Sequence, residues 1–139
     1  MPKPGAGDCI WLKTRDDGES NEPEGHWFVV LFDFEVFNSD TVIVPINSWE
    51  SERQDPTVKL REGDHPIIVR PSYVNYRMAQ VAYWSRIETW LTDGRARMHE
   101  QRFSDAMFAR IKGGMGQSRL GNPIAKAEYW RRLSREQSG

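Results

Sequence analysis

Polar side chains that can handle protons and phosphate gather in one short stretch, residues 64–77 of the 139-residue chain. It holds one histidine, two arginines, two tyrosines and a serine, which are His65, Arg70, Ser72, Tyr73, Tyr76 and Arg77. Arginine can hold a phosphate through two parallel hydrogen bonds, and tyrosine can stack on a nucleobase. Histidine titrates near neutral pH and can therefore donate or accept a proton. The stretch predicts a site that holds a phosphodiester chain and acts on it.

The same stretch also fits a structural role. His65 could cap a turn, and Arg70 could pair with Asp64. Tyr73 and Tyr76 could be core residues whose hydroxyl groups reach a polar partner. Binding and catalytic residues concentrate on loops, which favours the functional interpretation, but the sequence leaves both open.

Cleavage of RNA by its own 2′-hydroxyl group needs a base to take that proton and an acid to protonate the leaving oxygen. His26 begins an apolar run and is expected to be the base, unless it is only a structural residue at a strand start. His65, beside Asp64, is expected to be the acid. His99 lies in a charged segment and is expected to be structural. Trp49 follows an apolar run in a polar context, which favours an exposed ring for base stacking.

Apolar runs indicate the strands that must position these side chains. Runs of β-type residues predict strands over residues 8–13, 26–32, 40–46, 57–60, 66–70 and 78–83. Residues 14–25 are polar, have no apolar periodicity and are expected to form a long loop. Pro45 cannot donate a ladder hydrogen bond, which favours a strand end or an edge at that position.

Helix signals appear late in the chain. Three helices are expected, over residues 85–91, from Ser104 to the glycine pair at 113–114, and from Pro123 onward. Ser85 and Glu88 have the spacing of a capping box, which predicts the start of the first helix. Strands followed by helices predict an α+β fold in a single domain. Its expected parts are a loose segment at 1–7, a small mostly-β barrel at 8–100 and a helical extension at 104–135.

The order of these pieces resembles the PemK/MazF family of toxins from toxin–antitoxin systems. Gly7 and Asp8 open the first strand, a long polar loop follows, and HWFVVLF forms the next strand. The run VIVPINS resembles the family's third strand, which often ends in a Pro-Ile-Thr-like tetrapeptide. Residues 72–88 resemble the family's passage from strand to helix. The resemblance covers about residues 7–91.

The resemblance implies an SH3-like barrel, usually dimeric, that cleaves single-stranded RNA without a metal or other cofactor. It also implies an antitoxin partner. The family's usual catalytic arginine corresponds to His26, and its usual threonine corresponds to Asn47, with Ser48 beside it. The expected catalytic set is His26, Asn47, Ser48, His65, Arg70 and Arg77, and the expected RNA-binding set is Trp49, Ser72, Tyr73 and Tyr76. Arg70, Arg77 and His65 are expected to face one groove together with the loop at 14–25 and with Asn47 and Ser48.

Composition sets limits on the function. The formal net charge is −1, with 19 basic and 20 acidic side chains, so a basic site must come from local clustering. Cys9 is the single cysteine and cannot form an intramolecular disulfide. The N-terminus lacks the apolar stretch of a signal peptide, and no run has the length of a membrane span. A cytoplasmic protein is expected.

Two other functions fit the same sequence. The chain could be a non-catalytic SH3-like barrel that binds nucleic acid or a protein partner, or a structural protein used in assembly. The departures at His26 and Asn47 and the near-neutral charge favour the binding module, and the fold class alone does not decide. A groove that joins His26 with Arg70 or Arg77 would favour the nuclease.

Overall fold

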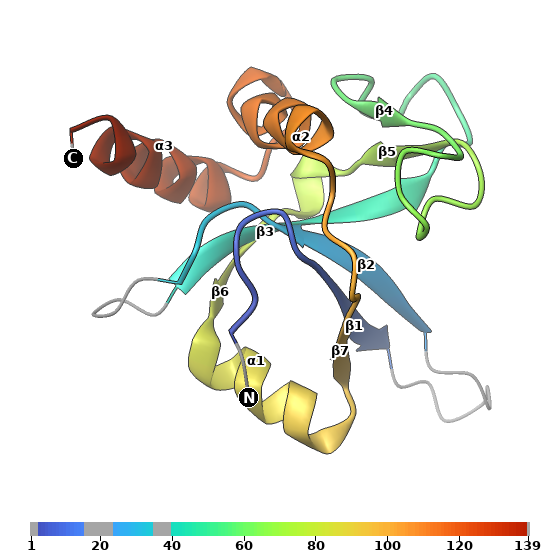
Figure 1. Ribbon diagram of the computed structural model, residues 1–139. Coiled ribbons are helices and arrows are strands. Elements are labelled where there is room, and N and C mark those ends of the chain that lie inside the picture. The colour runs from blue at the N-terminus through green and yellow to red at the C-terminus, as the bar shows by residue number, and fades with distance from the viewer. Residues whose placement is uncertain (1–2, 16–23, 35–39, 139) are drawn as a thin grey trace.

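Figure 1 shows the computed structural model of the chain, which describes residues 3–15, 24–34 and 40–138. The strands are β1 (Cys9–Arg15), β2 (Glu24–Val30), β3 (Asp40–Ser48), β4 (Lys59–Leu60), β5 (Ser72–Val74), β6 (Gln80–Tyr83) and β7 (Ala96–Met98). The helices are the 3₁₀ turn η1 (Tyr76–Met78) and the α-helices α1 (Trp84–Asp93), α2 (Asp105–Gln117) and α3 (Pro123–Ser138). The loop predicted at 14–25 lies largely outside the described residues.

The strands form one antiparallel sheet with the order β4-β5-β3-β2-β1-β7, and β6 pairs with β3 off this path. β3 is the central strand, because it pairs with β2 along one edge and with both β6 and β5 along the other. The α+β class is therefore confirmed. Among the described residues no strand pairing closes the sheet into a barrel.

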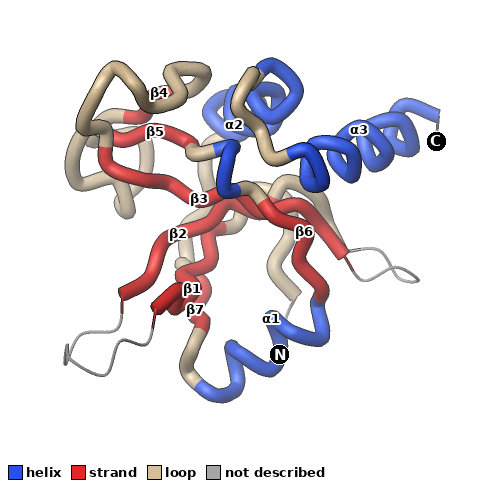
Figure 2. Tube along the Cα trace, turned by 180° about the vertical axis from the view of Figure 1, so that it is seen from behind, coloured by secondary structure: helices blue, strands red, loops and turns tan. Residues whose placement is uncertain are grey.

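Alternate side chains of the strands enter two separate cores, as the two-residue period of a strand requires. One core holds Cys9, Val29, Leu31, Val42 and Val44 together with Ile111, Met115, Ala125 and Tyr129 of α2 and α3. The other holds Ile10, Leu12, Phe28, Val30 and Ile43 together with Ile87 of α1. Figures 1 and 2 show α1 on one side of the sheet and the other two α-helices on the opposite side. The predicted helical extension is thus part of the body of the protein.

Pro45 lies inside β3, buried and paired with Phe28, and the expectation of a strand end or edge is wrong. The backbone N–H and C=O groups of a strand residue point to the same edge. The carbonyl of Pro45 accepts a hydrogen bond from the backbone N–H of Asn75 at 2.9 Å, so this edge is the one that β6 and β5 share. β6 pairs with β3 only as far as Ile43, and β5 begins to pair at Ile46. The missing donor of Pro45 therefore faces the junction between two partner strands.

Residues 66–70 form no strand, so the strand predicted there is wrong, and the segment begins with a turn over residues 65–68. The backbone N–H of Ile68 donates to the carbonyl of His65 at 2.9 Å, which closes the turn. Two observed strands were not predicted, β5 and β7, each of three residues. Three residues are too few to show a period of two, and both strands lie in sequence among arginines.

Several helix ends agree with the sequence. Ser104 caps α2 by accepting a hydrogen bond from the backbone N–H of Met107 at 3.2 Å, and Pro123 begins α3. Gly94 ends α1 in the left-handed conformation with φ of 86°. The capping box is wrong, because α1 begins at Trp84 and Ser85 lies within the helix.

The glycine pair at 113–114 does not end α2, which continues to Gln117. Gly114 instead permits close packing, since a Cβ atom there would overlap the hydroxyl group of Tyr76. That hydroxyl donates to the carbonyl of Ile111 at 2.6 Å. The helix therefore keeps a glycine in its interior because a tyrosine from η1 fills the space of a side chain.

Candidate functional site

His26 and Asn47 meet across the ends of β2 and β3. The register of these strands pairs Phe28 with Pro45, and two residues further along it sets His26 opposite Asn47. The side-chain nitrogen Nδ2 of Asn47 lies 3.1 Å from Nδ1 of His26. Asn75, just after β5, donates from its own Nδ2 to Oδ1 of Asn47 at 3.0 Å. Three side chains from three segments thus form one hydrogen-bonded row.

The direction of this row decides which nitrogen of a neutral imidazole carries the proton. The carbonyl oxygen of Asn47 is taken by Asn75, so Asn47 turns its NH₂ group toward His26 and donates to Nδ1. A neutral His26 then carries its proton on Nε2. Within the described part of the chain Nε2 forms no hydrogen bond, so it is available to bind a ligand. If both amide groups turn over together, Asn47 presents its carbonyl oxygen and Nε2 becomes the free lone pair.

An open hollow of about 390 Å³ lies in front of this row, and we call it the His26 hollow. It is lined by His26, Ile46, Asn47, Ser48, Glu50, Gln54, Tyr73 and Asn75. Burial raises the pKa of Tyr73, against a smaller opposing effect of a hydrogen bond with Gln54 and of the positive charge of Arg77. The phenol is therefore protonated at neutral pH and is a hydrogen-bond donor in the hollow.

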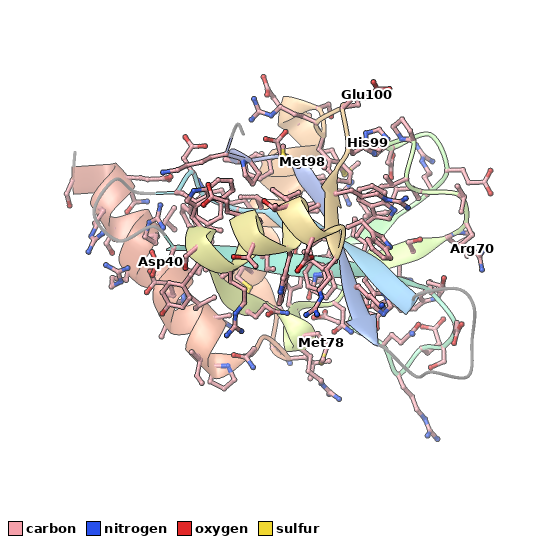
Figure 3. All side chains as sticks on the ribbon, turned by 90° about the horizontal axis from the view of Figure 1, so that it is seen from below. Asp40, Arg70, Met78, Met98, His99 and Glu100 are labelled. Atoms are coloured by element: carbon pink, nitrogen blue, oxygen red, sulfur yellow. The ribbon has the colours of Figure 1, made fainter. Side chains whose placement is uncertain are left out.

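The two arginines of the expected site lie apart from each other. Arg70 lines a smaller hollow of about 100 Å³, which shares Asn47 and Ser48 with the His26 hollow. Figure 3 shows Arg70 at the rim of the molecule, at the end far from Asp40. Arg77 is exposed on η1 and lines neither hollow, although its charge acts on Tyr73. The single groove expected for both arginines is therefore replaced by two neighbouring hollows with Arg77 beside one of them.

His65 is not in either hollow, contrary to the sequence expectation. Its side chain is only 3% exposed and packs against the rings of His99 and Phe103. Nε2 donates to the carbonyl of Gln101 at 2.7 Å, and Nδ1 accepts from the backbone N–H of Ile67 at 3.1 Å. Burial lowers the pKa of His65, partly opposed by the bond to Gln101. The residue holds a turn in the core, which is the structural alternative considered for it.

Tyr76 and Ser72 are also engaged within the protein. Tyr76 is completely buried and its hydroxyl group bonds to the carbonyl of Ile111, so it has no face on which a base could stack. Ser72 is buried, and its hydroxyl group donates to the carbonyl of Arg70 at 2.8 Å. The expectation that Tyr76 contacts RNA is therefore wrong. Ser72 still lines the wall of a hollow, and its contact with RNA stays a prediction.

Trp49 lies at the boundary between hollows. Its ring meets the ring of Tyr73 edge to face, with centroids 5.7 Å apart, and it lines a third hollow on the side of β4 and α2. Sequence reasoning did not assign a role to Glu50, Gln54 or Asn75, which line the His26 hollow. Asn75 stood in the polar stretch at 64–77, but only the register of β3 and β5 shows that it reaches Asn47.

The described residues hold no group of three or more His, Cys, Asp or Glu side chains arranged to bind a metal ion. None of their helices has the length and apolar character needed to cross a bilayer.

Comparison with known proteins gives a likeness of structure and none of sequence. No family model matches the chain, and no curated protein matches it. Two crystal structures of MazE-MazF from Deinococcus radiodurans, in Form-III and Form-II, each contain a chain that superposes with a TM-score of 0.55. The identities are 15% and 16%, and the alignments cover 84% of this chain and 95% and 96% of those chains. At this identity the likeness shows the fold, and this chain therefore has a MazF-like fold.

Proposed function

We propose that this chain is a toxin-like endoribonuclease that cleaves single-stranded RNA without a metal and is silenced by an antitoxin. The observation that carries the proposal is the contact between His26 and Asn47 at the His26 hollow. These are the two positions that the PemK/MazF resemblance assigns to catalysis, and they meet in a chain with the fold of a MazE-MazF structure. Two residues 21 positions apart in sequence would not be brought into contact by the fold class alone.

The row from Asn75 to His26 supplies the proton chemistry. With the row as it stands, Nε2–H of His26 donates a hydrogen bond to a phosphate oxygen and stabilises charge that grows on it. With both amides reversed, Nδ1–H is held by Asn47 and the Nε2 lone pair takes the proton of the 2′-hydroxyl group. The nucleophile is then the substrate's own oxygen, and the products end in a 2′,3′-cyclic phosphate and a 5′-hydroxyl group.

Donors around the hollow complete the reaction in this proposal. The protonated phenol of Tyr73 lies in the hollow wall, and Arg70 and Ser48 line the adjoining one. Arginine holds a phosphate in two-point contact, and hydroxyl donors stabilise the transition state. The acid role that was expected of His65 passes in this proposal to the phenol of Tyr73, whose proton goes to the leaving 5′-oxygen, because His65 is in the core.

The same resemblance leads us to propose a homodimer that works in the cytoplasm. It also leads us to propose a protein antitoxin, whose acidic segment would lie over the His26 hollow and fold on binding. The MazE-MazF structures, which pair two proteins by name, support this partner class. Co-expression of the neighbouring open reading frame should relieve growth arrest caused by this chain. Harmless high-level expression of the chain alone would count against a toxin.

A second function is favoured by one specific observation. The His26 hollow contains a single imidazole, since His65 is buried elsewhere. A non-catalytic module that binds nucleic acid or a protein partner needs no second proton-transfer group. Binding without turnover is the outcome that would select this alternative.

The deciding experiment incubates the purified chain with end-labelled single-stranded RNA in EDTA. Cleavage should give 2′,3′-cyclic phosphate ends and should fail on RNA carrying 2′-O-methyl groups. The His26→Ala variant is the matched negative control, because His26 is exposed and its loss removes no core contact. Cleavage that needs Mg²⁺, or equal cutting of DNA, would overturn the proposed mechanism.

A further inference from the structure

A third hollow, of about 470 Å³, lies between β4, β5 and α2, and we call it the basic hollow. It is lined by Trp49, Lys59, Leu60, Arg61, Asp64, Pro71, Ser72, Met107 and Arg110. Three of these side chains are cations that come from two parts of the chain, Lys59 and Arg61 from β4 and its following turn and Arg110 from α2. One carboxylate, that of Asp64, lies among them, so the wall carries a positive charge.

The three cations are not neutralised by the protein. Within the described residues neither Lys59, Arg61 nor Arg110 forms an ion pair. Asp64 directs Oδ2 to the backbone N–H of Arg61 at 2.8 Å, which holds the turn. Five other cations of the described residues do pair with carboxylates, namely Arg95 with Asp93, Arg102 with Asp8, Lys112 with Glu136, Arg131 with Glu128 and Arg132 with Asp40. Unpaired like charges around one hollow repel one another, and an anion placed there relieves that repulsion.

Trp49 holds one of these cations in place. The ammonium nitrogen of Lys59 lies over the Trp49 ring, 4.1 Å from its centroid. The ring itself is fixed by its edge-to-face contact with Tyr73, and the backbone N–H of Trp49 donates to the carbonyl of Pro71 at 2.9 Å. A cation packed on an aromatic face loses less freedom when it binds an anion than a solvated lysine does.

The basic hollow adjoins the proposed active site through lining residues that neighbouring hollows share. It shares Ser72 with the hollow of Arg70, and that hollow shares Asn47 and Ser48 with the His26 hollow. Trp49 follows Ser48 directly, so the end of β3 forms the wall between them. The basic hollow is therefore a neighbour of the proposed active site, with the hollow of Arg70 between them.

We propose that the basic hollow is a second subsite that binds a phosphate group of single-stranded RNA, away from the bond that is cut. This inference rests on the proposed function for the identity of the strand in the His26 hollow. Lys59 supplies a point charge and the two arginines supply planar donors that match phosphate geometry. RNA is favoured over an acidic polypeptide because the basic hollow neighbours a site proposed to act on a phosphodiester and has an aromatic ring, that of Trp49, in its wall.

The test measures binding of a fluorescent 2′-O-methyl RNA of about 12 nucleotides, a length within the usual footprint of a single-strand site. The modified RNA separates binding from cleavage. Lys59→Ala, Arg61→Ala and Arg110→Ala should each weaken binding about tenfold at low salt, the size expected for losing one charge-assisted hydrogen bond. Each loss of a phosphate contact should also lower the slope of log K against log salt by about 0.7.

Arg86→Ala is the matched control. Arg86 is an exposed cation of α1 that lies over the ring of Trp90, 5.8 Å from its centroid, much as Lys59 lies over Trp49. α1 is on the opposite side of the sheet from the basic hollow (Figure 1). The control should bind RNA like the unmodified chain with an unchanged salt slope.

The outcomes separate this inference from the proposed function. His26→Ala should lower the cleavage rate about a hundredfold or more, whereas the three hollow variants should weaken binding and keep the cyclic-phosphate product. Weakened RNA binding in a chain that never cleaves would retain the subsite and overturn the nuclease. A triple variant combines the three substitutions. If it still cleaves RNA and keeps the RNA affinity and salt slope of the unmodified chain, the subsite is overturned and the nuclease is retained. Poly-glutamate serves as the model of an acidic protein in the same binding assay. If the three hollow variants lose poly-glutamate binding and keep RNA binding, the hollow binds an acidic protein and our assignment to RNA is overturned.

Discussion

His26 and His65 have the same hydrogen bond at Nδ1 and opposite surroundings. In each ring Nδ1 faces an N–H donor, from the side chain of Asn47 for His26 and from the backbone of Ile67 for His65. Nε2 of His65 also donates a hydrogen bond to the carbonyl of Gln101, and the residue is 3% exposed. His26 is exposed and keeps Nε2 unbonded within the described residues.

The difference shows what turns a histidine into a candidate catalyst. A backbone donor cannot reverse, so the proton of His65 is fixed on Nε2 and its transfer would break two bonds of the core. A side-chain amide can reverse, so His26 can exchange the protonated nitrogen without loss of a partner. Reach to solvent and a reversible neighbour, rather than residue type, separate the two rings.

The largest expected effect is on cleavage by the His26→Ala variant. The rate should fall about a hundredfold or more, the usual contribution of one general acid–base group. Single-turnover cleavage of labelled RNA measures it. The free energy of unfolding should change little, because the side chain is exposed. A variant with unchanged rate would remove His26 from the mechanism and make the two histidines alike in function.

The next effect is on folding, in the His65→Ala variant. Loss of the buried ring leaves a cavity beside Phe103 and leaves the carbonyl of Gln101 without the donor that His65 provides. The free energy of unfolding should fall by roughly 3 kcal/mol, measured by urea denaturation. Cleavage per folded molecule should stay within a few-fold of the unmodified chain. A hundredfold loss of rate in a fully folded His65→Ala protein would contradict a purely structural role for His65.

Asn75→Ala tests whether the row of amides positions His26. Without Asn75 the Asn47 amide has no partner to fix its direction, and cleavage should fall about tenfold, the value of one oriented hydrogen bond. The acid limb of the pH–rate profile should move, since Asn47 can then turn its carbonyl oxygen toward Nδ1–H. Asn75→Asp keeps an acceptor and removes the donor, which makes it the matched comparison. A lower rate with an unmoved profile would reduce Asn75 to a merely structural residue.

Much of the sheet could be predicted from sequence because its central strands are continuous apolar runs. The runs around Val29 and Val44 predict β2 and β3 without any other information. β5 and β7 could not be found, because three-residue strands are defined by their neighbours rather than by a period. The glycines at 113–114 resembled a helix stop because the tyrosine that needs the space comes from a distant segment.

The site divides in the same way. His26 and Asn47 were assigned to catalysis only through the family resemblance. Their contact was not predicted, since spacing along the chain does not give the register between strands. His65 was assigned to the surface because Asp64 and Pro66 beside it are polar or turn-forming. Its burial comes from contacts with Gln101 and Phe103, which follow β7 in the sequence. The composition around His65 cannot predict burial by residues that are distant in sequence.

The smallest expected effect is a dependence of stability on pH that comes from His65. Burial lowers the pKa of the folded His65 below its ordinary value of 6.5, with the neighbouring ring of His99 acting in the same direction and the bond to Gln101 against it. The thiol of Cys9, 3.8 Å from Nε2, stays neutral because burial and the charge of Asp8 raise its pKa to about 12. The unfolded chain therefore takes up a proton first as the pH falls. The stability contributed by neutral His65 is complete above pH 6.5 and is lost as the pH falls toward the folded pKa.

Urea denaturation between about pH 7.5 and pH 5.5, above the usual range of carboxylates, isolates this effect. The unmodified chain should lose stability across the interval, and His65→Gln should lose less, since the amide does not titrate and can still donate toward Gln101. If His65→Gln does not fold, an NMR titration of the unmodified chain answers the same question through the imidazole signals. A midpoint for His65 at or above 6.5 would contradict the buried, neutral ring on which the contrast with His26 depends.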